Sequence, residues 1–125
     1  MIHLDTSYLI RALAPNAVED ARLRTWIRDR TSLAISAICW TEFLCGPLTE
    51  TQIGLARQVL GEPVVYSGSD AERAAELYNL SGRRRGSLVD CMVAAIALGA
   101  GASLATTNAR DFSRFEPAGL QLVRT

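Results

Sequence analysis

Short apolar stretches alternate with longer helix-like stretches along most of this 125-residue chain. Capping residues open the longer stretches, and Gly or Pro closes several of them, so we expect helices there and strands between them. The expected strands are 1–4, 32–35, 64–66, 103–105 and 121–123, and the expected helices are 5–12, 17–28, 36–46, 49–60, 69–80, 87–99 and 108–115.

Strands separated by helices of about ten or more residues favour a mostly parallel sheet, because parallel neighbours need a long crossover connection. We therefore expect an α/β fold. It would be a three-layer sandwich, with a central mostly parallel sheet of four to five strands and helices on both faces. The length and the continuous pattern predict one domain over residues 1–125.

The composition excludes several kinds of chemistry. All 13 cations are arginines, which excludes Schiff-base lysines, a P-loop of the Walker type and the lysine-dependent phospho-acceptor sites of receiver domains. The single histidine, His3, lies in an apolar stretch, which argues against a His-rich zinc site or a Ser-His-Asp triad. Carboxylates, hydroxyls and guanidinium groups remain as the functional side chains.

The three cysteines, Cys39, Cys45 and Cys91, have no CxxC spacing. They lie in apolar helical stretches, so we expect buried thiols in a reducing compartment. No apolar run reaches the roughly 18 residues that span a bilayer, and the start of the chain lacks the pattern of a signal peptide. These features predict a cytoplasmic protein with no membrane partner.

Two acidic residues follow expected strands. Asp5 comes directly after the first strand, and Asp111 follows the strand at 103–105. Ligands of open parallel α/β folds bind outside the carboxyl ends of the strands, so both positions favour a functional site. The alternative is helix capping, with Asp5 as an N-cap and Asp111 in the first turn of a helix capped by Asn108.

A third acid, Glu42, interrupts a nearly apolar helix. Helical geometry places it in the sector of Ile38, Cys39 and Cys45, so we expect a buried carboxylate. Such a group needs an arginine, a proton or a metal ion. A structural salt bridge to an arginine is therefore the alternative to a functional role.

The fourth acid, Asp90, is the one charge in the most apolar helix. It shares a face with Ala94 and Ala97, whose small side chains allow close approach of another backbone. Ser87 and Asp90 also fit the S-x-x-D capping pattern, which is the alternative interpretation.

These four acids would meet at one edge of one sheet. At about 4 Å and an effective dielectric constant of about 20, each pair of carboxylates repels by about 4 kcal/mol. A cation would relieve that repulsion, and without one some of the groups would take up protons. Oxygen ligands without His or Cys select Mg²⁺ or Mn²⁺ before Zn²⁺. The sequence thus indicates metal-assisted hydrolysis of a phosphodiester.

The residues around these acids resemble the motifs of a PIN domain. The resemblance rests on residues 2–10, on Ser36-Ala37-Ile38 before Glu42, on residues 88–97 around Asp90, and on Thr106-x-Asn108-x-x-Asp111-Phe112. It extends over essentially the whole chain. The order, spacing and length are similar to those of VapC-type toxin ribonucleases of toxin–antitoxin pairs.

The resemblance implies a Mg²⁺- or Mn²⁺-dependent endoribonuclease that acts on RNA, forms a homodimer and is held inactive by a VapB-type antitoxin. Asp5 and Asp90 match the metal ligands, Glu42 matches the acid that completes the site, and Asp111 matches the fourth catalytic acid. The polar residues that match groups orienting the carboxylates or touching phosphate are Thr6, Ser7, Thr106 and Asn108.

Two surfaces suit these partners. Arg83, Arg84 and Arg85 lie in a Gly-bounded loop before the Asp90 helix, where they would hold RNA phosphate or simply form a solvated loop. The helices at 17–28 and 49–60 would leave an apolar groove for an antitoxin helix.

Other functions stay open at this stage. One alternative is a PIN-like nuclease of RNA processing that is not a toxin, and another is a non-enzymatic interaction module in which the acids are caps and salt bridges. A phosphatase or receiver-like phospho-acceptor is disfavoured, because the chain has no lysine and no DxDxT after its first strand.

Overall fold

A computed structural model describes residues 1–124 and contains a parallel sheet with the strand order β2-β1-β3-β4. The strands are β1 (Ile2–Leu4), β2 (Leu33–Ala34), β3 (Ser103–Ala105) and β4 (Gln121–Leu122). In the register of the sheet, His3 lies opposite Ala34 on one side and Leu104 on the other. The sheet is short, and β1 and β3 form its centre.

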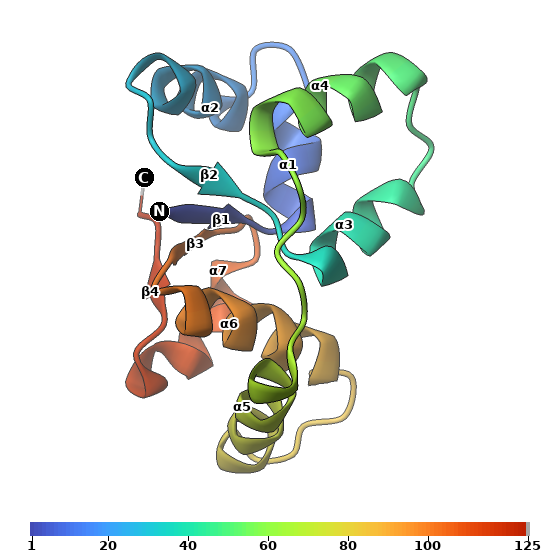
Figure 1. Ribbon diagram of the computed structural model, residues 1–125. Helices are drawn as coiled ribbons and strands as arrows, with labels where there is room; N and C mark the ends of the chain where they lie inside the picture. Colours follow the sequence, from blue (N-terminus) through green and yellow to red (C-terminus); the bar gives the residue numbers. More distant parts are fainter. Residues whose placement is uncertain (125) are drawn as a thin grey trace.

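Helices lie on either side of this sheet (Figure 1). They are α1 (Thr6–Ala12), α2 (Val18–Arg28), α3 (Ala37–Leu44), α4 (Glu50–Leu60), α5 (Gly68–Leu80), α6 (Leu88–Ala100), α7 (Ala109–Phe112) and the 3-10 helix η1 (Ser113–Ala118). Figure 1 shows α2 and α4 toward one end of the molecule and α5 and α6 toward the other. The predicted α/β fold with a central parallel sheet is therefore confirmed.

The core forms where α6 packs on the sheet and on α5. Ala94, Ala95 and Ala97 of α6 are fully buried, since their small side chains allow close packing. Phe43 of α3 and Phe112 of α7 close the same core. The most apolar helix of the sequence is thus the central helix of the structure.

Two predicted elements differ in the structure. Residues 64–66 do not form a sheet strand, because only Val64 pairs, in an isolated bridge with Ser36. The helix expected at 108–115 divides into α7 and η1, and Pro117 within η1 has no amide proton to donate to a longer α-helix.

The prediction that all three cysteines are buried is wrong for Cys45, which is exposed just after α3. An apolar groove is found beside α4, but α1 rather than α2 forms its other side. It has a volume of about 330 Å³ and joins the end of α1 to the start of α4. It is lined by Ile10, Leu13, Ala14, Pro15, Gly46, Pro47, Leu48 and Gln52. Helix α2 does not contribute, because its apolar face packs on α1.

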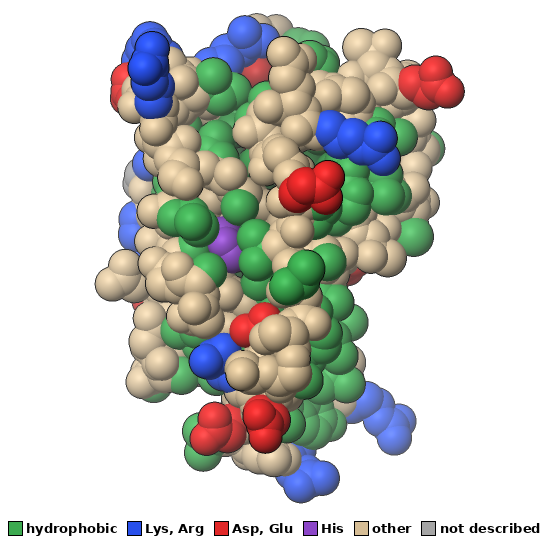
Figure 2. All heavy atoms as spheres, viewed as in Figure 1, with side chains coloured by type: hydrophobic (Ala, Val, Ile, Leu, Met, Phe, Trp, Pro, Cys, Tyr) green, Lys and Arg blue, Asp and Glu red, His purple; other side chains and the backbone are tan. Residues whose placement is uncertain are grey.

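The surface mixes side chains of all kinds, and acidic residues are scattered over the face drawn in Figure 2. Among residues 1–124, the longest apolar helices fall short of the length needed to cross a bilayer. The carboxyl ends of β1 and β3 lead directly into α1 and, through residues 106–108, into α7. Side chains from both connections therefore meet at this edge of the sheet.

Candidate active site

Asp5 is the central buried acid of this edge, with 6% of its surface exposed. Its position between β1 and α1 is fixed by its backbone amide, which donates to the carbonyl of Ala105 at 2.9 Å. One carboxylate oxygen, Oδ2, accepts from the hydroxyls of Ser7 and Thr106, both at 2.8 Å. The other, Oδ1, accepts from the thiol of Cys39 at 3.5 Å. Asp5 occupies the N-cap position of α1 but makes no capping bond with its side chain, so the capping interpretation is wrong.

The two hydroxyls that hold Asp5 are themselves oriented by backbone amides. The amide of Thr107 donates to Ser7 Oγ at 3.2 Å, and the amide of Asn108 donates to Thr106 Oγ1 at 3.0 Å. Each hydroxyl has a single proton, so a hydroxyl that accepts from an amide directs that proton to Asp5. Asn108 acts here through its backbone, and its side chain does not cap α7.

Glu42 lies on the exposed side of α3, which contradicts the prediction of a buried carboxylate. The helix turns Cys39 and Phe43 inward but leaves Leu44 exposed, so its apolar composition overstates how much of it is covered. The hydroxyl of Thr6 lies 3.0 Å from the carbonyl of Cys39 and 3.3 Å from Glu42 Oε1. Within residues 1–124, no arginine forms an ion pair with Glu42, so the salt-bridge alternative has no support.

Asp5, Glu42 and Cys39 form a compact group of donors. One ligand atom from each lies within 4.8 Å of the others. Burial, and then the charge of Asp5, raise the pKa of the Cys39 thiol to about 12, so this thiol keeps its proton and serves as a hydrogen-bond donor. The group therefore offers carboxylate oxygens rather than a thiolate, which suits a hard cation such as Mg²⁺ or Mn²⁺.

The charges in this group repel one another. Although Glu42 is exposed on one side, partial burial of its carboxyl against α1 raises its pKa most. The negative charge of Asp5 raises the pKa further, and the charge of Asp90 adds a smaller increase. The hydrogen bond from Thr6 opposes these effects. A divalent cation would remove this repulsion, since it favours the charged form of every carboxylate around it.

Asp90 lies in the first turn of α6 and is half-buried. The expected S-x-x-D cap does not form, because the hydroxyl of Ser87 donates to the carbonyl of Arg84 at 2.7 Å instead. The capping alternative is therefore wrong for Asp90. Its carboxylate pairs with Arg114, whose Nη2 lies 3.3 Å from Oδ2.

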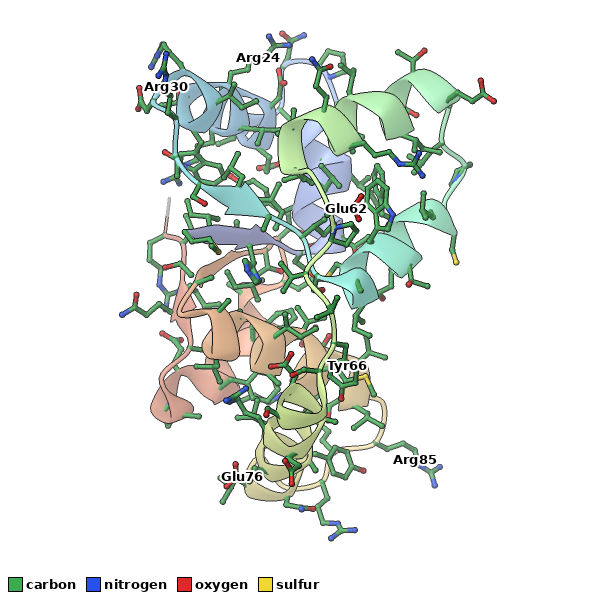
Figure 3. The ribbon with its side chains drawn as sticks, in the orientation of Figure 1. Arg24, Arg30, Glu62, Tyr66, Glu76 and Arg85 are labelled. Carbon is green, nitrogen blue, oxygen red and sulfur yellow. The ribbon has the colours of Figure 1, made fainter. Side chains whose placement is uncertain are left out.

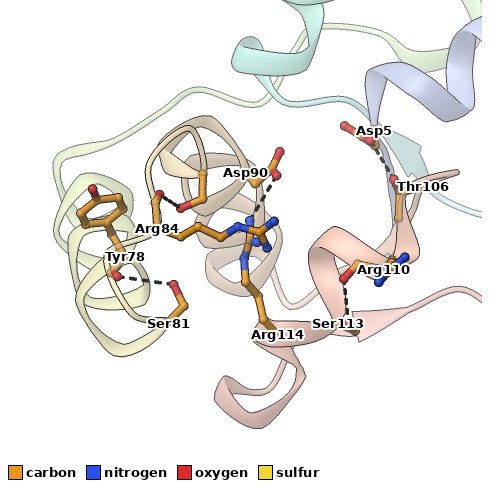
Figure 4. A network of polar contacts seen from close by, with 10 residues as sticks. Asp5, Tyr78, Ser81, Arg84, Asp90, Thr106, Arg110, Ser113 and Arg114 are labelled. Carbon is orange, nitrogen blue, oxygen red and sulfur yellow. Dashed lines mark hydrogen bonds and ion pairs between the residues drawn. The ribbon is translucent and has the colours of Figure 1, made fainter.

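Asp90 interacts electrostatically both with Asp5 and with the residues around Arg114 (Figure 4). Asp5 and Asp90 extend from β1 and α6 toward the same region. Burial raises the pKa of Asp90, and the charges of Asp5 and Asp111 raise it as well. The guanidinium of Arg114, with a smaller contribution from Arg84, lowers it. The carboxylate of Asp90 is therefore influenced by two acids, Asp5 and Asp111, and by two arginines.

A pocket of about 120 Å³ opens beside Asp90. Its lining residues are Arg84, Arg85, Gly86, Ser87, Asp90, Asp111 and Arg114. The exposed Asp111 on α7 therefore belongs to this pocket, whereas Asp5 and Glu42 lie outside it. Arg83 does not line it either, and Figure 3 shows Arg85 extending outward from the body of the molecule.

Sequence reasoning missed Arg114 and the thiol of Cys39. Arg114 follows Asp111 by three residues, about one helical turn, and that spacing is the signal that could have identified it. Cys39 precedes Glu42 by the same interval, a spacing that brings two side chains of a helix near each other. Both residues contact an acid that the sequence did identify.

Comparison with known proteins identifies the family of the chain. The profile of the PIN domain family matches residues 2–116, and the chain belongs to that family. The comparison with curated proteins gave no match.

Solved structures share the fold. A toxin–antitoxin complex from Klebsiella pneumoniae is 26% identical, with 90% of this chain and 91% of that chain covered and a TM-score of 0.72. VapBC2 from Rickettsia felis, bound to a promoter DNA fragment, is 22% identical, with 98% of both chains covered and a TM-score of 0.77. VapC20 from Mycobacterium tuberculosis, a toxin that cleaves the sarcin-ricin loop, is 18% identical, with 100% of both chains covered and a TM-score of 0.68.

Proposed function

We propose that this protein is a metal-dependent endoribonuclease and the toxin of a toxin–antitoxin pair. The observation that carries the proposal is the group formed by Asp5 and Glu42. Their oxygens lie within 4.8 Å of one another, and no arginine pairs with either of them among the described residues. Charges left unbalanced in this way are typical of a site for a divalent cation.

The donor set fits Mg²⁺ or Mn²⁺. Asp5 and Asp90 would hold the ion, and Glu42 would complete the site. When bound, such an ion supplies Lewis acidity that makes water a better nucleophile and offsets negative charge on the phosphate. Asp111, at the far side of Asp90, is proposed as the fourth catalytic acid.

The surrounding residues would position these acids. Ser7 and Thr106 hold Oδ2 of Asp5, and Cys39 holds Oδ1, which leaves little freedom for the carboxylate to rotate. Thr6 orients Glu42. Glu42 lies beside Asp5, so its carboxylate would position the attacking water or accept its proton.

The partner would be an antitoxin. The neighbouring structures from Klebsiella pneumoniae and Rickettsia felis are described as toxin–antitoxin and VapBC assemblies. We propose that a VapB-type antitoxin docks an amphipathic helix in the apolar groove between α1 and α4. We also propose a homodimer, which light scattering after size-exclusion chromatography would test.

Cleavage of RNA by the purified protein tests the enzymatic proposal. We expect cleavage with Mg²⁺ or Mn²⁺, no cleavage with EDTA, and loss of cleavage in Asp5→Asn and Asp90→Asn. Cleavage that persists in EDTA or in both variants would refute the mechanism. A correctly folded protein that cleaves no RNA would instead favour an interaction module.

Expression in cells tests the toxin role separately. We expect growth arrest that is relieved by co-expression of a small antitoxin encoded next to this chain. RNA cleavage in vitro without growth arrest would favour a PIN-like nuclease of RNA processing.

A further inference from the structure

The two halves of the site have opposite charge balance. Asp5 and Glu42 lie together without a paired arginine among residues 1–124. The neighbouring pocket contains three arginines (84, 85 and 114) and two acids (90 and 111). One half therefore favours a cation, and the other carries a formal excess of one positive charge.

Arg114 is the most constrained cation of this pocket. Its side chain is 19% exposed, its Nη2 lies 3.3 Å from Asp90, and its guanidinium carbon lies 4.9 Å from the ring centre of the buried Phe115. Its Nε is buried and has no hydrogen-bond partner within the described part of the chain. A guanidinium has five N–H donors in a rigid fork. The Nε–H of Arg114 is buried and Asp90 takes one Nη2 donor, so the other Nη donors are the ones that a ligand in the pocket could contact.

Arg84 comes from the loop before α6, and that loop is anchored. Its carbonyl accepts from both the hydroxyl and the amide of Ser87, at 2.7 and 3.1 Å. Arg84 and Arg114, both labelled in Figure 4, line the same pocket, and the charge of each lowers the pKa of Asp90. Two neighbouring guanidinium groups repel, and an anion placed between them would relieve this repulsion.

We propose that Arg114 and Arg84 form a subsite for a phosphate of the RNA strand beside the acidic group, in which Asp90 fixes the orientation of Arg114. This inference rests on the proposed function, because it assigns a place to the substrate of the same site. A metal ion on Asp90 would offset one of the two acids near the arginines, so the pocket would attract phosphate more strongly. Binding of a metal ion by Asp90 and binding of an RNA phosphate by the two arginines would then strengthen each other.

The test measures RNA binding without cleavage. Mixed-sequence single-stranded RNA with a fluorescent label is titrated with the full-length protein in EDTA over a series of salt concentrations. Contacts to phosphate do not depend on base sequence, so the natural substrate is not needed. Each lost phosphate contact lowers the slope of log K against log salt by about 0.7 for single strands.

We expect a slope reduced by about 0.7 in Arg84→Gln and in Arg114→Gln. Arg114→Lys keeps the charge and should restore the slope. Arg24→Gln changes the same residue type at an exposed position on α2, toward the opposite end of the molecule (Figure 3), so it is the matched control and should keep the slope of the parent protein.

The outcomes separate this inference from the proposed function. Unchanged slopes in both Arg84→Gln and Arg114→Gln, or an equal reduction in Arg24→Gln, would overturn the subsite even if the protein cleaves RNA. The absence of measurable RNA binding by the parent would overturn it as well. Reduced slopes in a protein that cleaves no RNA would support the subsite and refute the nuclease. If Arg114→Gln fails to fold, the exposed Arg84 decides the question, with folding checked by circular dichroism.

Discussion

The chain contains two S-x-x-D sequences at the start of long helices, and they form different structures. Ser67 and Asp70 make a reciprocal capping box at the start of α5: Ser67 Oγ accepts from the amide of Asp70, and Asp70 Oδ2 accepts from the amide of Ser67. Ser87 and Asp90 make neither bond at the start of α6. Both acids also pair with an arginine, Asp70 with Arg73 at 3.1 Å and Asp90 with Arg114 at 3.3 Å.

The two motifs differ in where the partners of the acid come from. In α5 the arginine comes from the same helix, so every partner of Asp70 is local and structural. In α6 the serine turns back to the carbonyl of Arg84, and the acid is left to a partner 24 residues away in the sequence. An acid released from capping in this way is available to other ligands.

The largest expected effect separates the two acids directly. Asp90→Asn should lower RNA cleavage more than about 100-fold, the upper end of the loss for a supporting group, because a proposed metal ligand is removed. Asp70→Asn should leave cleavage within about twofold, since Asp70 lies outside the site. The measurement is initial cleavage rate at saturating Mg²⁺ for both variants. Equal losses would show that Asp90 is structural like Asp70.

A smaller effect is expected from the groups that hold Asp5. Thr106→Val keeps the shape of the side chain and removes the hydroxyl that donates to Asp5, so it should lower cleavage about 10- to 100-fold. Thr41→Val is the matched control, because Thr41 is exposed and, within residues 1–124, its hydroxyl bonds only to the carbonyl of Ala37 one turn earlier in the same helix. Equal activity of the two variants would contradict the positioning role of Thr106.

The capping difference should also appear in stability. Ser67→Ala removes the cap of α5 and should lower the free energy of unfolding by about 1 kcal/mol. Ser87→Ala removes no cap, so it should cost less, namely the hydrogen bond to Arg84 alone. Urea unfolding in EDTA measures both values. A larger loss in Ser87→Ala would contradict the assignment of these two motifs.

The smallest effect concerns pH. Folding raises the pKa of Glu42, so the folded state binds more protons than the unfolded state between the ordinary and the raised pKa. The contribution of Glu42 to stability therefore falls as pH rises through that window. In EDTA, Glu42→Gln should remove this fall. Near neutral pH, the free energy of unfolding of Glu42→Gln should exceed that of the parent by a few tenths of a kcal/mol. The difference is small because solvent screens the charge of the exposed Glu42.

Urea unfolding of the parent and of Glu42→Gln from about pH 4 to about pH 8 measures this pH dependence of stability. A variant that is less stable than the parent at every pH would show that Glu42 forms a structural ion pair. Glu42→Gln should also lose RNA cleavage while its fold survives.

Much of the fold was predictable, because the alternation of strands and helices is strong in this chain. The parallel sheet, the seven helical regions and the central α6 follow from hydrophobic pattern and capping residues. The strand at 64–66 was not predictable as a single bridge, since its apolar sequence is the same in either state. Helix α5 was expected to begin at residue 69, but Ser67 caps it and it begins at Gly68. Ser67 and Ser69 each have an acid three residues later, Asp70 and Glu72, so the capping pattern does not distinguish them.

The acids of the site were predictable, but their partners were not. Asp5, at the end of β1, and Glu42, on α3, lie near each other as expected. The exposure of Glu42 was wrongly predicted, since an apolar helix need not be covered on every side. The ion pair of Arg114 with Asp90 joins residues 24 positions apart, so no local pattern predicts that pair, although the three-residue spacing from Asp111 does place Arg114 near another acid of the site.

Binding of Mn²⁺ in the absence of RNA tests most directly whether the acids at this edge form a cation site. Isothermal titration calorimetry with the parent protein should show saturable binding. Asp5→Asn should abolish that binding, and Asp70→Asn should bind as the parent does. A parent protein that binds no Mn²⁺, or an Asp5→Asn variant that binds it equally well, would contradict the account.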